Sequence, residues 1–145
     1  MLRAFIVCSC LFLFSRPTLA ADLSDASEVR KVADSAMQLV RSNDIPAALN
    51  SFKPFWSLPP AEIDVGVSKI VDQRKAIATR YGKPVGVQFL DQKSVGDTVI
   101  RLQYLEKFEN HFIRWQFYFY KPTSRWQFNS FNMDDQIRDL PYCAA

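Results

Sequence analysis

The chain of 145 residues changes its hydrophobic period once, between Gly82 and Pro84, and this change constrains the fold more than any other feature. Before it, apolar residues recur every three or four positions, as they do along one face of a helix. After it, they alternate with polar residues, as they do along a half-buried strand. The pattern predicts an α+β domain with three N-terminal helices packed on one face of a curved four-stranded antiparallel sheet.

The three helices have sequence signals at their ends. Asp25 with Glu28 three residues later has the spacing of a capping box and begins a helix over about Ala26 to Ser42. A short second helix is expected from Ile45 to about Phe52, with a proline in its first turn. The third follows the proline pair at 59 and 60 and ends at Tyr81, where a glycine cap and a further proline stop it.

Four strands follow, separated by turn residues at hairpin lengths. Their expected ranges are Val85–Lys93, Thr98–Phe108, His111–Tyr120 and Arg125–Met133. Pairing the strand ends predicts a register, in which the partners include Tyr104 with Trp115, Phe119 with Trp126, and Phe89 with Leu102. All three hairpins then bring apolar side chains to one continuous face.

The opposite face of this sheet is predicted to be polar. In the same register one row crosses all four strands, and it consists of Gln88, Gln103, Gln116 and Asn129. The residues beside this row are Arg101, Arg114 and Tyr118. The face is either a solvated surface with paired amides or an interface for a dimer or a ligand, since aromatic, Arg and Gln side chains mix at many interfaces.

Residues 1–20 have the composition of a cleaved secretory signal peptide. Arg3 gives a positive start, an apolar run extends from Ala4 to Phe14, and small residues precede the expected cleavage point after Ala20. The run is shorter than the roughly 20 apolar residues of a membrane-spanning helix. We expect a single domain over residues 21–145, no stable membrane span after cleavage, and a periplasmic or secreted location. An uncleaved anchor and a buried N-terminal helix are the alternatives.

Cleavage alters what the composition implies. The chain has a formal charge of +3, but Arg3 and Arg16 lie in the signal, so 16 of the 18 basic residues remain against 15 acidic ones. A nearly neutral domain argues against nucleic-acid binding, which needs a clustered basic surface. Two of the three cysteines also lie in the signal, which leaves Cys143 without an intramolecular disulfide partner.

Two stretches resemble the nuclear-transport-factor-like (SnoaL-like, cystatin-like α+β cone) superfamily. One is NDIPAALNSF, which begins the second helix, and the other is RWQFYFYKPTSRWQFNSFNMDD in the last two strands. The second is similar to small exported bacterial proteins of that superfamily. The resemblance implies a cone-shaped pocket between sheet and helices. It implies no reaction, because the superfamily includes isomerases, dehydratases, cyclases and non-catalytic binding domains.

An enzyme resembling the ketosteroid isomerases of this fold would hold a carboxylate base and a hydroxyl donor inside the cone. The register places Tyr104, Glu106, His111 and Asp91 on the apolar face. The first three are the candidate catalytic residues, and Tyr104 and Glu106 could exchange protons with a carbonyl compound. Alternatively, Tyr104 is a core residue and the other two mark the rim of the sheet. The expected lining of the pocket is Trp56, Phe89, Tyr104, Trp115 and Phe117.

Other chemistries find little support in the sequence. With one His and no Cys pair we expect no metal site, and without a phosphate-binding glycine loop we expect no cofactor. Arg74, Lys75 and Arg80 are expected on a solvated face of the third helix. We therefore expect a non-enzymatic exported domain that binds a small apolar ligand or a protein partner and forms a homodimer through the open sheet face. The alternative is an isomerase- or dehydratase-like enzyme acting on a small hydrophobic carbonyl compound.

Overall fold

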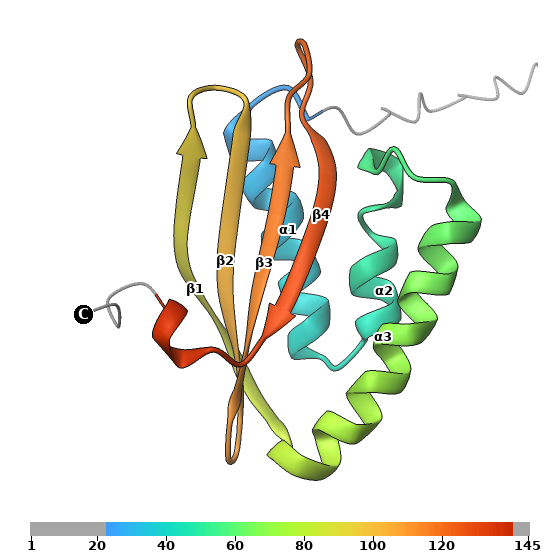
Figure 1. Ribbon diagram of the computed structural model, residues 1–145, viewed down its shortest axis with the longest axis vertical. Coiled ribbons are helices and arrows are strands. Elements are labelled where there is room, and N and C mark those ends of the chain that lie inside the picture. The colour runs from blue at the N-terminus through green and yellow to red at the C-terminus, as the bar shows by residue number, and fades with distance from the viewer. Residues whose placement is uncertain (1–22, 141–145) are drawn as a thin grey trace, which may run out of the picture.

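The change of period at Gly82 is the boundary between helices and sheet in the computed structural model, which describes residues 23–140. The helices are α1 (Ala26–Arg41), α2 (Ile45–Asn50), the 3-10 helix η1 (Lys53–Phe55) and α3 (Pro60–Tyr81). The strands are β1 (Pro84–Val95), β2 (Val99–Phe108), β3 (Phe112–Tyr120) and β4 (Gln127–Asp134), and the 3-10 helix η2 (Ile137–Asp139) follows them. This order confirms the α+β class (Figure 1). The expected signal peptide and Cys143 lie outside the described residues.

Side-chain caps start the first two helices. Oδ1 of Asp25 accepts hydrogen bonds from the backbone N–H groups of Ser27 (2.7 Å) and Glu28 (3.0 Å), two donors that have no partner inside α1. Asp44 caps α2 in the same way through the N–H of Ala47, at 3.1 Å. Both starts match the sequence prediction.

The ends of α2 and α3 follow from proline and glycine. α2 ends at Asn50, earlier than expected, because the chain tightens into 3-10 turns that lead to Pro54. α3 ends at Tyr81 and is followed by Gly82, whose φ of 83° is a conformation that residues with a side chain rarely adopt. A Cβ at this position would also lie 2.7 Å from Oε2 of Glu109, a flexible side chain that would have to shift, so the positive φ is the main reason for glycine here.

The strands form one antiparallel sheet in the order β1-β2-β3-β4. The central hairpin has the predicted register, with Tyr104 opposite Trp115 and Leu102 opposite Phe117. Its two-residue turn leaves no freedom to slip, because a shift by one residue would turn every apolar side chain to the other face.

Both outer hairpins differ from the predicted register. Phe89 lies opposite Tyr104 rather than Leu102, and Phe119 lies opposite Phe128 rather than Trp126. The two outer turns differ in length from those expected. β1 and β2 pair as far as Val95 and Val99, where Gly96 (φ 54°) allows a three-residue loop. In the last hairpin the turn is longer than expected, because β4 begins only at Gln127. In addition, the register shifts after Phe89 and again between Tyr118 and Phe119, as at β-bulges.

The bulge in β4 decides which of its side chains face the core. Beyond it the pairing advances by one residue, so Phe131 lies opposite Phe117 and Met133 opposite Trp115. Both side chains therefore turn to the apolar face and pack against the core. Phe131, which the uninterrupted register would place outside, is an inner residue.

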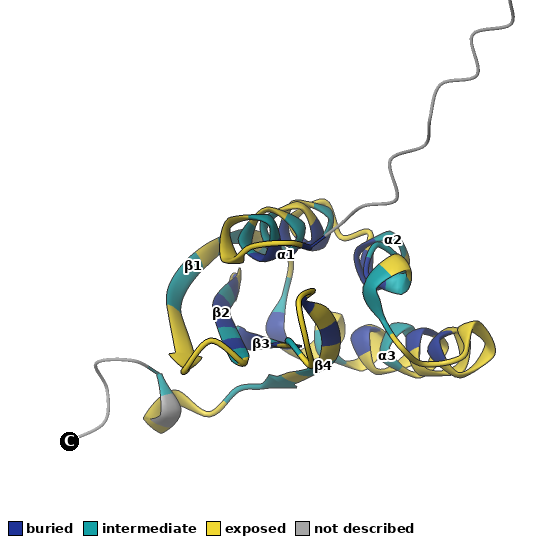
Figure 2. Cartoon of the chain, turned by 90° about the horizontal axis from the view of Figure 1, so that it is seen from above, coloured by how far each residue is buried: buried dark blue, intermediate teal, exposed yellow. Residues whose placement is uncertain are grey.

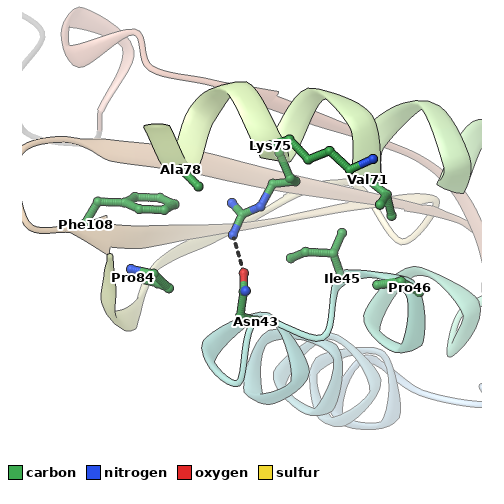
Figure 3. A pocket seen from close by; sticks show the side chains of 9 residues that line it. Asn43, Ile45, Pro46, Val71, Lys75, Ala78, Pro84 and Phe108 are labelled. Atoms are coloured by element: carbon green, nitrogen blue, oxygen red, sulfur yellow. Dashed lines mark hydrogen bonds between the residues drawn. The ribbon is translucent and has the colours of Figure 1, made fainter. Parts of the chain in front are cut away.

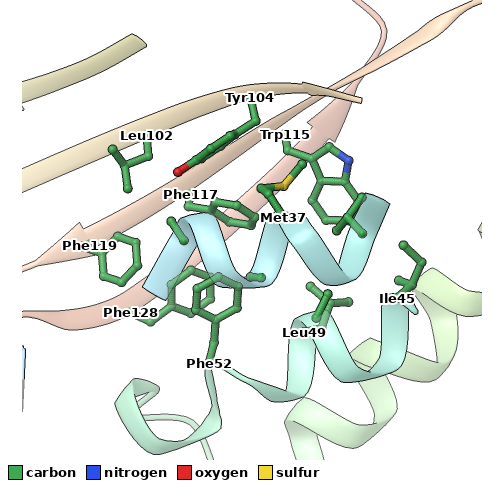
Figure 4. Packing of buried hydrophobic residues seen from close by; sticks show 14 of the residues in the cluster. Met37, Ile45, Leu49, Phe52, Leu102, Tyr104, Trp115, Phe117, Phe119 and Phe128 are labelled. Atoms are coloured by element: carbon green, nitrogen blue, oxygen red, sulfur yellow. The ribbon is translucent and has the colours of Figure 1, made fainter. Parts of the chain in front are cut away.

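The core lies between the sheet and α1, which packs across one face of β1 and β2 (Figure 2). α2 packs against α1, and α3 packs against α2 on the β4 side of the sheet. Between these layers the aromatic side chains of the inner face are closely packed (Figure 4). The largest fully buried side chains include Trp115, Phe52, Phe117, Phe119 and Phe128.

Among the residues that the structure describes, no α-helix covers the other face of the sheet. Figures 1 and 2 show the segment after β4, including η2, crossing this face on the side opposite to α1. We call this face of the sheet, opposite to α1, the outer face. No helix among residues 23–140 is long and apolar enough to cross a membrane.

Candidate functional site

The space between the sheet and the helices, where the resemblance implied a pocket, is filled by side chains. Trp115, Phe117 and Tyr104 are buried, and Phe52, from the turn after α2, packs beside Phe128 and Phe117 (Figure 4). The ring of Phe52 stacks on that of Phe128, with centroids 4.0 Å apart, and lies 5.0 Å from that of Phe117.

The two other predicted lining residues lie at the margins of this core. Phe89 is half-buried beside Tyr104, with ring centroids 5.3 Å apart. Trp56 is half-buried against Phe128 and donates its indole N–H to the backbone carbonyl of Asn129 at 3.2 Å. All five predicted lining residues therefore belong to one aromatic packing unit.

The side chain of Tyr104 is hydrogen-bonded to α1. Its hydroxyl donates to Oδ1 of Asp34 at 2.8 Å, and Arg30 binds the same carboxylate through Nε at 2.8 Å. Burial, followed by the hydrogen bond to Asp34, raises the pKa of Tyr104 far above its ordinary value. The guanidinium of Arg30 lies 3.4 Å from the ring centroid of Phe89, a cation–π contact that completes the cluster.

Glu106 is bonded to α3 through a buried ion pair. Its side chain is 0 % exposed, and Arg74, 8 % exposed, donates to Oε2 through Nη1 at 2.7 Å and to Oε1 through Nη2 at 2.6 Å. The indole N–H of Trp115 donates to Oε2 at 2.8 Å. Both carboxylate oxygens are thus engaged by fixed donors, and Arg74 lies in the core rather than on the solvated face expected of it.

His111 lies beside the β2–β3 turn, toward the same end of the sheet as Glu106, but its hydrogen-bond partner is neither of the other two candidates. Its Nε2 is 3.3 Å from Oδ2 of Asp135, and the hydroxyl of Tyr81 donates to the same oxygen at 2.7 Å. These contacts join the end of α3, the β2–β3 turn and the segment after β4. The three candidate catalytic residues therefore belong to three separate hydrogen-bonded groups and do not converge.

The Tyr81→Phe variant is expected to lose stability at neutral pH but not in acid. The hydrogen bond from Tyr81, followed by that from His111, lowers the pKa of Asp135 from its ordinary value of 3.8. A lowered folded-state pKa gives stabilisation that is present above about pH 3.8 and is lost as the pH falls through the folded-state value. Urea midpoints of the two proteins should differ at about pH 6 and converge near pH 2. A difference that persists in acid would contradict this account.

A pocket of about 260 Å³ opens where α3 meets the first turn of α2 and the ends of β1 and β2 (Figure 3). Its apolar lining consists of Ile45, Pro46, Val71, Ala78, Pro84 and Phe108. Its polar lining consists of Asn43, Arg74 and Lys75. Nη2 of Arg74 also donates to Oδ1 of Asn43 at 3.4 Å, so the buried ion pair reaches the pocket wall. We call this the basal pocket.

The outer face has a polar row, but not the predicted one. Gln103 and Gln116 lie opposite each other as expected, and both are buried. The row continues to Asp91 and Asn132, because the shifted hairpins move the expected end members, Gln88 and Asn129, out of line. Both of these displaced residues are exposed.

The remaining predicted interface residues also lie on the outer face. Arg114 is buried and binds Asp134 through Nε (2.9 Å) and Nη2 (2.7 Å). Arg101 and Tyr118 are half-buried and lie opposite each other. Arg101 contacts Asp91 through Nη2 at 3.2 and 3.4 Å.

Within residues 23–140, no group of three or more His, Cys, Asp or Glu side chains is arranged to hold a metal ion. Comparison of the sequence with protein-family models finds no matching family. A search of the curated proteins returns no match either.

Proposed function

We propose that this protein is an exported, non-catalytic binding domain of the nuclear-transport-factor-like type, and that it holds a small apolar ligand in the basal pocket. The observation that carries the proposal is the chemistry of that pocket: six apolar residues and a few polar groups at one end of the domain. Binding sites for small molecules commonly combine a mainly apolar lining with a few fixed polar groups. Its volume of about 260 Å³ suits a ligand smaller than a typical drug molecule.

The interior argues against the enzymatic alternative. A base that abstracts a proton must reach the substrate, whereas both oxygens of Glu106 are bound by Arg74 and Trp115. The general acid that donates a proton to the carbonyl oxygen of the substrate would have to be Tyr104, but its hydroxyl already donates to Asp34. Isomerase- or dehydratase-like chemistry would require both groups to be released and the packed aromatic core to open.

Ala78→Phe should abolish ligand binding without unfolding the domain. Ala78 lines the pocket from an exposed position of α3, so a phenyl ring there fills the cavity and displaces no core side chain. Octanoate, 1-hexanol and indole are suitable probes in thermal unfolding. A probe that binds should stabilise the protein, by about 2.7 kcal/mol at 100 times its Kd, and should have no effect on the variant.

Ala76→Phe is the matched control, because Ala76 is also an exposed alanine of α3 but does not line the pocket. It should respond to the probe as the unsubstituted protein does. Mass spectrometry of the protein isolated from its native compartment would identify a retained ligand. If none of the probes shifts the unfolding temperature and no molecule is retained, the basal pocket is not a binding site.

A further inference from the structure

Gln103 is a buried amide without hydrogen-bond partners at the centre of the outer face. Its side chain is 0 % exposed, and neither Oε1 nor Nε2 has a partner within the described part of the chain. Removing an amide from water without replacing its hydrogen bonds is unfavourable for folding. An apolar side chain of similar size would fit this position better, so the glutamine needs another explanation.

Arg101, two residues away on the same face, is bound by long hydrogen bonds to Asp91. Its Nε is also buried and unpartnered among the described residues. Its contacts with Asp91 measure 3.2 and 3.4 Å, longer than the roughly 2.7–2.9 Å of a strong charge-assisted hydrogen bond. The side chain of Arg101 is 26 % exposed, and the segment after β4 crosses the same face, so a partner reaches the buried amide of Gln103 through a local movement on this face.

The charge of the outer face favours an acidic partner. The outward positions of the four strands include the basic residues Lys93, Arg101, Lys107 and Arg114 and the acidic residues Asp91 and Asp134. Asp134 is bound by Arg114, and Asp91 is shared by Arg101 and, at 4.0 Å, by Lys93, so the four basic residues exceed the two acidic ones by two charges.

We propose that the outer face around Gln103 binds an extended, acidic segment of another protein. An amide side chain offers one acceptor and two donors, which match the N–H and C=O of one peptide unit. Arg101 then donates to a carboxylate of the same segment, since a guanidinium fork fits a carboxylate. The unpartnered amide is thereby explained as a group that is satisfied only in the complex. This site is independent of the basal pocket.

Gln103→Leu tests the proposal through two opposite effects. The variant removes the unpartnered amide, so its unfolding temperature should rise. Its affinity for the partner should fall about tenfold or more, as expected for the loss of a hydrogen-bonded contact in the complex. The probe is a fluorescein-labelled peptide of alternating Glu and Ala, measured by fluorescence anisotropy, with a Lys and Ala peptide of equal length that should bind at least tenfold more weakly.

Gln88→Leu is the matched control, because Gln88 is an exposed glutamine of β1 outside the polar row. It should leave both the unfolding temperature and the affinity unchanged. Three results would overturn the proposal: a lower unfolding temperature of Gln103→Leu, unchanged affinity of that variant for the Glu peptide, or no binding of the Glu peptide by the protein. Self-association that Gln103→Leu abolishes would also overturn it, because the face would then belong to a second copy of the chain.

Discussion

Replacing Arg74 with alanine is expected to lower the free energy of unfolding by about 3–5 kcal/mol. The variant leaves the carboxylate of Glu106 buried with only the indole N–H of Trp115 as a partner. A buried carboxylate without its counter-ion has lost its hydration and has no ion pair to compensate for that loss, so the free energy of the native state rises. Urea denaturation followed by tryptophan fluorescence measures the change.

Two further variants separate the charge effect from a general effect on α3. Lys75→Ala removes the neighbouring cation, which is exposed and paired with Asp72, and should cost less than about 1 kcal/mol. The double variant Arg74→Met with Glu106→Leu removes both charges and should recover most of the loss, except for about 1–3 kcal/mol from the unpaired indole of Trp115. If Arg74→Ala costs no more than Lys75→Ala, the ion pair does not stabilise the fold.

The central hairpin shows which parts of the fold the sequence predicts well. A two-residue turn and strong alternation fix the partners of Tyr104 and Leu102 without reference to the rest of the chain. The outer hairpins have longer turns, and their registers depend on bulges near Phe89 and Asn129. A bulge shifts the alternation of apolar and polar residues by one position. In β4 the three-residue step from Phe128 to Phe131 is a local signal of this shift, whereas in β1 the residues after Phe89 are mostly polar and give none.

The candidate site was predicted only in part, because the bonding partners of its residues lie far away in the sequence. Placing Tyr104 and Glu106 on the inner face requires only their alternation along β2. Their partners Asp34 and Arg74 lie on separate helices, and the sequence around Arg74 reads as a solvated helix end. A buried arginine is revealed by its counter-ion, here 32 residues away in the chain, and only the packed structure brings the two together.

Phe52→Ala is expected to cost about 3–5 kcal/mol of unfolding free energy, because it removes a fully buried ring. The ring stacks on Phe128 and contacts Phe117 and Phe119, all three of them buried and held by the sheet. Phe117 and Phe119 lie on β3, which is paired on both sides and cannot move in to fill the space, so the variant should retain an apolar cavity at the centre of the core.

Benzene binding distinguishes a retained cavity from a collapsed core. A dry cavity lined by rigid apolar groups binds small apolar molecules, so benzene should raise the unfolding temperature of Phe52→Ala and leave that of the unsubstituted protein unchanged. Phe55→Ala is the control, since Phe55 is only half-buried and its loss should open no enclosed space. No response of Phe52→Ala to benzene would mean that the core has closed.

A response would show that the space between sheet and helices has the shape of a ligand pocket and that the single side chain of Phe52, supplied by the turn after α2, keeps it filled. The binding function then depends on the surfaces outside the core, and changes to Phe52 should leave both the basal pocket and the outer face able to bind.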